Sequence, residues 1–374
     1  MIIMAEALFW GCFLIILYVY FGYPALIAGL AFLFPSRINK GPVEPSVTVI
    51  VVAHNEEKII RRKLENLISL DYPPGKRRIV VVSDASTDQS DKIIEEFNGQ
   101  GVILHRMDNR GGKPAALNRI IPILQDEVII FSDSRQLWNI ESIRALVANF
   151  ADANVGAVSG ELHIHSDQNR SGVGEGVGLY WKYEKFLRKQ EALFDSTCGT
   201  TGCIYAIRRS LFEVIPDDTL LDDFVIPFNI VKKGKRVVFE EKAIAVDSPS
   251  DTTELEMRRK TRTLAGNYQA LFRMSWLIVP WENRLFFQFV SHKLLRLAVP
   301  FLMIGIFLLN ILLLEYDFYR FCFIGQTGFY LLGSLPESPK LRIAGTIRVF
   351  LLLNLTALIA LPVFLSGRQR VAWK

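Results

Sequence analysis

The stretch Glu127-Val-Ile-Ile-Phe-Ser-Asp-Ser-Arg135 decides the fold. Residues 128–131 form a short apolar run with β-branched side chains, which is typical of a strand buried on both faces. Asp133 follows where that strand would end. Ligands of open α/β sheets bind beyond the carboxyl ends of the strands, so Asp133 stands at the position of a site residue. The alternative is that Asp133 starts a turn, or caps a helix that begins near Ile140.

Three earlier segments have the same form. Apolar, β-branched runs occupy residues 47–53, 78–83 and 101–105, and each is followed by a segment with apolar positions at helical spacing. Strands that alternate with helices in this way predict an α/β fold with a mostly parallel sheet and helices on both faces. Polar residues gather at the expected strand ends, namely Asn55, Glu56, Asp84, Lys113 and Asp133.

The connecting loops exclude two common nucleotide sites. A dinucleotide fold needs Gly-x-Gly-x-x-Gly after the first strand, where this chain has His54-Asn-Glu56. A P-loop needs Gly-x-x-x-x-Gly-Lys-Ser/Thr, whereas Gly112-Lys113 is followed by Pro114. The strand ends instead offer carboxylates, an amide and a lysine. These groups suit a charged nucleotide rich in hydroxyls, held directly or through a metal ion.

Apolar residues concentrate at the two ends of the chain. Residues 7–34 carry no charge, and residues 297–314 and 349–367 form two further uncharged runs, which predict membrane spans. The run 321–335 contains Gln326 and Thr327, so it predicts either a third C-terminal span or a re-entrant or interfacial piece.

Flanking charges predict the orientation. Arg37 and Lys40 follow the first apolar run, whereas only the acidic Glu6 precedes it, so the middle of the chain should face the cytoplasm. Arg368 and Arg370 fit this orientation only if residues 321–335 do not fully cross the membrane.

Taken in order, the motifs resemble those of the family 2 glycosyltransferases, whose GT-A fold is a Rossmann-like mixed sheet with helices on both faces. Four motifs of the first half carry the resemblance: Val52-Ala-His-Asn-Glu-Glu57, Ser83-Asp-Ala-Ser-Thr-Asp88, Arg110-Gly-Gly-Lys113 and Ser132-Asp-Ser134. It continues in Gly199-Thr-Thr-Gly202 and in Leu221-Asp-Asp-Phe224, and it spans Val47 to about Trp276. With the apolar ends, the chain is most similar to membrane enzymes of the type of poly-N-acetylglucosamine, cellulose and hyaluronan synthases.

The resemblance implies a donor site for a nucleotide sugar, and specifically for a UDP-sugar. Asp84 would meet the base, Lys113 would lie near the diphosphate, and Asp133 would coordinate Mg²⁺ or Mn²⁺ bridging the two phosphates. The rest of this site would comprise Ala53, His54, Asn55 and Glu56 and, near the membrane, Arg259 and Arg262.

The resemblance also implies the catalytic groups. Asp223 would take the proton of the acceptor hydroxyl, and its neighbour Asp222 would complete the acidic pair. Gly199 and Gly202 would lie on the acceptor side. The alternative for the acidic pair is a helix N-cap before residues 225–231.

Two departures from the family pattern bear on function. Arg135 stands where the family usually has a second acid of the metal motif. Thr263 follows Arg262 where the synthases carry a tryptophan, which puts processive synthesis in doubt. The alternative for the basic residues 258–262 is a helix that faces solvent or lipid headgroups.

Other features carry less. The net charge of +5 is scattered, so no nucleic-acid partner is expected. Cys198 and Cys203 form a lone Cys-x4-Cys pair, which is not a zinc signature. His163 and His165 alternate on an expected strand, as polar strand residues or, less simply, as contacts of acceptor or metal.

We therefore expect a membrane-bound, inverting glycosyltransferase that transfers a sugar from a nucleotide sugar to a glycan or lipid-linked acceptor. The expected parts are an N-terminal anchor (1–36), a cytoplasmic GT-A domain (45–276), an interfacial helix (282–296) in contact with membrane lipids, and a C-terminal membrane region of two or three spans (297–367). We expect a multi-pass protein of the cell (inner) membrane. Two rivals are a single-addition enzyme acting on a lipid-linked acceptor and a catalytically impaired subunit that binds sugar nucleotides.

Overall fold

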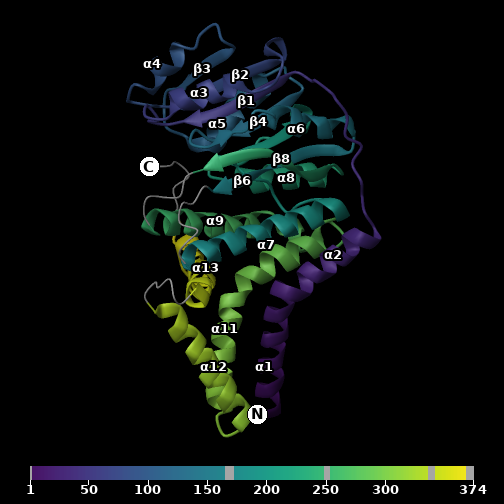
Figure 1. The fold of residues 1–374 in the computed structure, drawn as a ribbon, viewed down its shortest axis with the longest axis vertical. Coiled ribbons are helices and arrows are strands. Elements are labelled where there is room, and N and C mark those ends of the chain that lie inside the picture. Colours follow the sequence, from purple (N-terminus) through teal and green to yellow (C-terminus); the bar gives the residue numbers. More distant parts are fainter. Residues whose placement is uncertain (1, 165–171, 248–252, 336–341, 368–374) are drawn as a thin grey trace. The chain divides into compact units, whose positions relative to one another are not determined.

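The computed structural model describes residues 2–164, 172–247, 253–335 and 342–367 (Figure 1). Its residues group into two compact units. The sheet unit is built from Phe34–His165 and Glu191–Pro249, and the helical unit from Met1–Leu33, Ser166–Gln190 and Ser250–Arg368.

The sheet unit contains one mixed sheet of eight strands in the order β3-β2-β1-β4-β7-β6-β8-β5. The strands are β1 (Val47–Ala53), β2 (Arg77–Asp84), β3 (Val102–Met107), β4 (Val128–Ser132), β5 (Leu137–Trp138), β6 (Val155–Ile164), β7 (Ile204–Arg208) and β8 (Arg236–Asp247). Strands β1 to β4 are parallel, β7 is antiparallel to β4 and β6, and β5 is antiparallel to β8. The predicted α/β fold is confirmed, and its parallel half is the part in which strands and helices alternate along the chain.

Five α-helices of the sheet unit follow strand ends or bridge strands. They are α3 (Ile60–Ser69), α4 (Ser90–Glu95), α5 (Gly112–Ile120), α6 (Ser142–Ala148) and α8 (Asp222–Lys232), with short 3₁₀ turns at Pro74–Lys76, Ile121–Ile123, Asn149–Ala151 and Arg209–Leu211. Alternate residues of β1 share a fully buried core with apolar residues of α3 and α4, among them Val49, Val51, Ile60, Leu64 and Ile94. This core fixes the strand ends at which the polar residues lie.

The helical unit holds the apolar ends of the chain. Its elements are α1 (Ile2–Leu17), a π turn η1 (Tyr18–Gly22), α2 (Tyr23–Leu33), α7 (Gly172–Phe194), α9 (Thr253–Arg273), a 3₁₀ turn (Ser275–Ile278), α10 (Phe286–Phe289), a π turn η7 (Val290–Leu294), α11 (Leu295–Leu312), α12 (Asp317–Ser334) and α13 (Arg342–Leu365). Within this unit α1 runs beside α11, and α11 beside α12 (Figure 1).

Three of the described helices are long and apolar enough to cross a membrane, by length and composition. They cover Ile2–Leu33, Phe286–Leu312 and Ile343–Leu365, and each overlaps one of the uncharged runs of the sequence. The run 321–335 is also helical, as part of α12, but this helix is not among the three.

Two expected boundaries differ from the structure. The region 45–276 is not one compact unit, because α9 packs on α13: Tyr268 Oη donates to the Ala357 carbonyl at 3.4 Å, and its ring stacks on Phe364. The segment 282–296, expected as an interfacial helix leading into the membrane, is helical from Phe286 onward. It then continues through the π turn η7 into α11, so it forms one helix with the second apolar run.

Candidate active site

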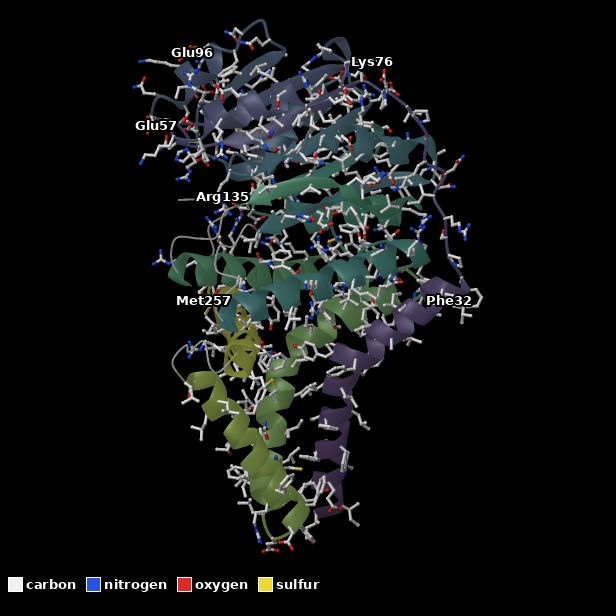
Figure 2. The ribbon with its side chains drawn as sticks, viewed as in Figure 1. Phe32, Glu57, Lys76, Glu96, Arg135 and Met257 are labelled. Atoms are coloured by element: carbon white, nitrogen blue, oxygen red, sulfur yellow. The ribbon has the colours of Figure 1, made fainter. Side chains whose placement is uncertain are left out.

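The polar residues singled out from the sequence lie at one end of the parallel strands. Glu57 and Arg135, which follow β1 and β4, lie toward one side of the sheet unit in Figure 2, whereas Lys76, which precedes β2, lies toward the other. The carboxyl ends of β1, β2 and β4 therefore meet at the edge where ligands of such sheets bind.

The loops after β1 and β2 hold each other through hydrogen bonds between side chains and main chain. Asn55 Oδ1 accepts from the Thr87 N–H at 2.8 Å, and Asn55 has a φ of 57°, a left-handed conformation that asparagine tolerates. The Glu56 N–H donates to Ser90 Oγ at 2.8 Å, and the Glu57 N–H donates to Asp88 Oδ2 at 3.1 Å. These bonds fix the shape of the predicted nucleotide pocket.

Two residues predicted for this pocket support its loops from within the fold. Ala53 is buried in the core beneath the loops, so its contribution is to support them. His54 Nδ1 donates to the Asp84 carbonyl at 2.7 Å, which ties the end of β1 to the end of β2.

Asp84 anchors the glycine loop that begins α5. Its Oδ1 accepts from the Gly111 N–H at 2.7 Å and its Oδ2 from the Gly112 N–H at 2.9 Å. Gly112 has a φ of 81°, a left-handed conformation for which glycine is the residue of least strain. The carboxylate thus sets where α5 starts, and with it the position of Lys113.

Lys113 joins three elements at the centre of the site. Its Nζ lies 3.0 Å from Oδ1 of Asp133, the residue after β4, and 3.3 Å from Oδ2 of Asp222, the first residue of α8. It also donates to the Gly202 carbonyl at 3.3 Å. Burial lowers the pKa of Lys113, but the carboxylates of Asp133 and Asp222 outweigh that effect and raise it, so the ammonium stays charged. The structure therefore brings together Lys113, Asp133 and Asp222 of the acidic pair.

The acidic pair forms the first turn of α8. Leu221 is the N-cap and makes no side-chain capping bond, so the pair does not serve as the cap. Asp222 is buried and accepts from Tyr205 Oη at 3.2 Å. Asp223 is half-buried. Both carboxylates lie at the positive end of the helix dipole.

The glycine segment before β7 lies against Asp223. The Asp223 carbonyl accepts from the Thr200 N–H at 2.9 Å, and a methyl group at Gly202 would lie 2.8 Å from Asp223 Oδ2. Gly199 has a φ of 109°, and a methyl group there would lie 3.5 Å from the Asp223 carbonyl oxygen. The predicted acceptor-side glycines and the predicted base thus occupy one place in the sheet unit.

Arg135 has a partner that sequence reasoning missed. Its guanidinium pairs with Asp247, which is buried and ends β8. The same Asp247 Oδ2 accepts from Gln136 Nε2 at 2.9 Å. In the sequence, Asp247 is a carboxylate at the end of an apolar run. Its position beside Arg135 follows from the pairing of β5 with β8, which the sequence does not show.

The donor set suits a divalent ion that is shared with phosphates. The Asp133 side chain is 40% exposed, and only its Oδ1 faces Lys113. Among the described residues, no group of three or more His, Cys, Asp or Glu side chains could hold a metal ion alone. Burial is the largest cause of the raised pKa of Glu56. The nearby carboxylates of Asp88 and, to a smaller extent, Asp133 raise the pKa further. Magnesium is typically bound by one or two carboxylates plus phosphates and water, which fits Asp133 at this edge.

Three other predicted residues lie elsewhere. Arg259 and Arg262 belong to α9, in the helical unit. His163, on β6, forms a 2.7 Å pair with the buried Glu161 of the same strand, and it has no further metal-binding partners among the described groups. His165 lies outside the described residues.

The mixed sheet with its acidic, strand-end site defines the class of GT-A glycosyltransferases. Over 94% of this chain and 99% of the other, the fold is shared with the mannosyltransferase PcManGT from Pyrobaculum calidifontis, which was solved with GDP-Man and Mn²⁺, at a TM-score of 0.65 and 22% identity. Residues 48–215 match the family described as Glycosyl transferase family 2, so the chain carries a family 2 glycosyltransferase domain.

Two curated relatives are similar over most of this chain. The beta-monoglucosyldiacylglycerol synthase of Trichormus variabilis (strain ATCC 29413 / PCC 7937) is 31% identical over 297 residues, 70% of this chain and 59% of the relative. The probable glycosyltransferase YdaM of Bacillus subtilis (strain 168) is 26% identical over 242 residues, 61% of this chain and 57% of the relative. The chain thus spans less than two thirds of the length of either relative.

Proposed function

We propose that this chain is a membrane-bound, inverting glycosyltransferase that moves a sugar from a nucleotide sugar, a UDP-sugar in the simplest case, to a hydroxyl of a lipid or glycan acceptor. The observation that carries the proposal is the cluster of Lys113, Asp133, Asp222 and Asp223. It combines a charged group for a diphosphate, an exposed carboxylate for a metal ion and a carboxylate beside the glycine segment.

The mechanism we propose is a single displacement. The donor lies over the ends of β1, β2 and β4, with its base toward Asp84 and its diphosphate toward Lys113 and Asp133. A divalent ion on Asp133 would neutralise charge on the departing nucleoside diphosphate. Asp223 takes the proton of the acceptor hydroxyl as the oxygen attacks the anomeric carbon from the opposite face, which inverts the configuration there.

The two acids of the pair take different tasks in this mechanism. Asp222 is buried and is held by Lys113 and Tyr205. Asp223 is half-buried beside Gly202, where an acceptor hydroxyl can reach it. We therefore assign Asp223 as the general base and Asp222 as the group that keeps Lys113 in place.

Two classes of acceptor fit this site. A membrane lipid is favoured by the similarity to a beta-monoglucosyldiacylglycerol synthase and by Thr263 in place of a tryptophan that would support a polymer. The second candidate is a growing glycan, favoured by the motifs shared with polysaccharide synthases.

One experiment separates these readings. Detergent-solubilised protein is incubated with Mn²⁺, a panel of UDP- and GDP-sugars, and either diacylglycerol or short glycans. We expect release of one nucleoside diphosphate that depends on both donor and diacylglycerol, with a single sugar in the product. A ladder of products on a glycan favours the polymer synthase, and nucleotide binding without any release, for every pair, rejects the enzyme proposal.

A further inference from the structure

A buried lysine lies beneath the segment that carries Asp133. Lys63, on α3, has no exposed surface, and its Nζ donates a 2.5 Å hydrogen bond to the main-chain carbonyl of Gln136. The same Nζ lies 4.7 Å from the centroid of the Trp138 ring. Burial lowers the pKa of Lys63 to about 7, against a smaller opposite effect of nearby groups that include Asp133.

Burial of the Lys63 ammonium group has a cost in stability. Removing an ammonium group from water costs free energy, and a methionine of similar length would fill the same volume without that cost. The acceptor of its hydrogen bond is a neutral carbonyl rather than a carboxylate. What Lys63 supplies is a fixed position for the main chain of Gln136, three residues beyond Asp133.

Asn66 holds the next part of the same segment from the same helix. Its Nδ2 donates to the Trp138 carbonyl at 2.9 Å, and its Oδ1 accepts from the Trp138 N–H at 2.8 Å. Residues three positions apart lie on one face of a helix, so Lys63 and Asn66 approach the segment together. Trp138 Nε1 also donates to the Cys203 carbonyl at 3.1 Å, which ties the segment to the residue that precedes β7.

The opposite end of the segment is held by β4, whose last residue is Ser132. Asp133 therefore lies between two anchors: the strand before it, and the contacts of Lys63 and Asn66 after it. A carboxylate that must meet a metal ion and a diphosphate needs to be placed within a fraction of an ångström, and supporting contacts supply that precision.

We propose that Lys63, assisted by Asn66, is a positioning residue for the donor site: it fixes the segment from Arg135 to Trp138 and thereby the direction of the Asp133 carboxylate. The inference rests on the proposed function, since it takes Asp133 as the group that meets the diphosphate and its metal ion. Lys63 itself has no exposed surface, so we assign it no contact with the donor or the metal.

The main variant is Lys63→Met in the full-length protein, which keeps the apolar stem and removes the hydrogen-bond donor. We expect calorimetry to show affinity for UDP or GDP with Mn²⁺ reduced by about 10- to 100-fold, the range for loss of a buried bond that leaves a carbonyl unpaired. The donor KM rises by a similar factor while kcat changes little. Hydrogen–deuterium exchange of a peptide covering residues 133–138 becomes faster in the protein without ligands.

Two further variants complete the test. Asn66→Ala should change nucleotide affinity and exchange in the same direction, and it decides the question if Lys63→Met does not fold. Leu67→Met, on the same helix and in the apolar core, is the matched control and should leave both readings unchanged.

Unchanged affinity and unchanged exchange in Lys63→Met and Asn66→Ala overturn the inference. An equal effect of Leu67→Met also overturns it, because general packing of α3 would then explain the result. Failure of the proposed function looks different: the wild-type protein would turn over no donor, while the exchange experiment, which needs no ligand, would still report whether Lys63 fixes the segment.

Discussion

Neighbouring residues of one motif can take separate tasks in the proposed site, because a helix points them in different directions. Asp222 and Asp223 are adjacent in the first turn of α8, and successive residues of a helix do not share a face. One carboxylate is held by Lys113 and Tyr205, and the other lies against Gly202. The chemistry of each acid should therefore respond differently to the same substitution.

Asp223→Asn should abolish transfer while leaving donor binding nearly intact. An amide keeps the size of the side chain but cannot take a proton, and loss of a general base typically costs about 10² to 10⁴ in rate. Turnover and nucleotide affinity are measured side by side, with Asp222→Asn as the companion. That variant leaves Lys113 with one fewer carboxylate and should weaken nucleotide binding or stability first. If Asp223→Asn keeps near wild-type turnover and Asp222→Asn is inactive, Asp222 is the general base and the assignment to Asp223 is wrong.

Arg135→Asp should keep activity and change its dependence on metal. The substitution restores a second acid near Asp133 but removes the partner of the buried Asp247, so carboxylates face one another until a cation enters. We expect transfer to persist and to respond to a different Mn²⁺ concentration from the wild type, as measured by titration of activity. Arg135→Met is the control that removes charge without adding an acid. Complete loss of activity in both variants at saturating Mn²⁺ would show that Arg135 contacts the donor.

At the scale of elements, strands β1 to β4 follow from the sequence because each is an apolar run between polar loops. The residues at their ends, from Asn55 to Asp133, were predicted for the same reason. Strand β5 could not be predicted, since it has two residues and exists through its pairing with β8. Asp247 and Lys63 were missed for a related reason. Both are brought to the site by contacts between segments far apart in the chain, and no local pattern marks them.

Gly202→Ala should lower activity with little change in stability. The added methyl group would lie 2.8 Å from Asp223 Oδ2 and 3.3 Å from its Cγ, so the carboxylate must move aside. The φ of Gly202 is not left-handed, so the main chain accepts alanine. Misplacing a reacting group by about 1 Å can cost about 100-fold in rate. Gly75→Ala, with no atom within 4 Å of the added carbon, is the control and should match the wild type in rate and melting temperature.

At the scale of the molecule, the three long apolar helices and the charges beside them constrain each other. Leu33 ends the first helix and Arg37 and Lys40 follow it, whereas the acidic Glu315 and Asp317 follow the second helix after Leu312. Basic residues favour the cytoplasmic side of a membrane. If both helices cross, the sheet unit lies on one side and the turn between α11 and α12 on the other.

We expect the sheet unit to face the cytoplasm, where sugar nucleotides are made. Single cysteines are introduced at Gln100, Gln125 or Glu315, which are all exposed, in protein whose four native cysteines are replaced by alanine. Cells are treated with an impermeant maleimide before or after lysis.

Cysteines at 100 and 125, in the sheet unit, should react only after lysis, and the cysteine at 315 should react in intact cells. Prompt labelling at 100 and 125 in intact cells would reverse the orientation, and protection of all three positions until lysis would mean that the second helix does not cross. Because the donor must reach Lys113 and Asp133, the reversed orientation would also remove the nucleotide sugar from the proposed mechanism.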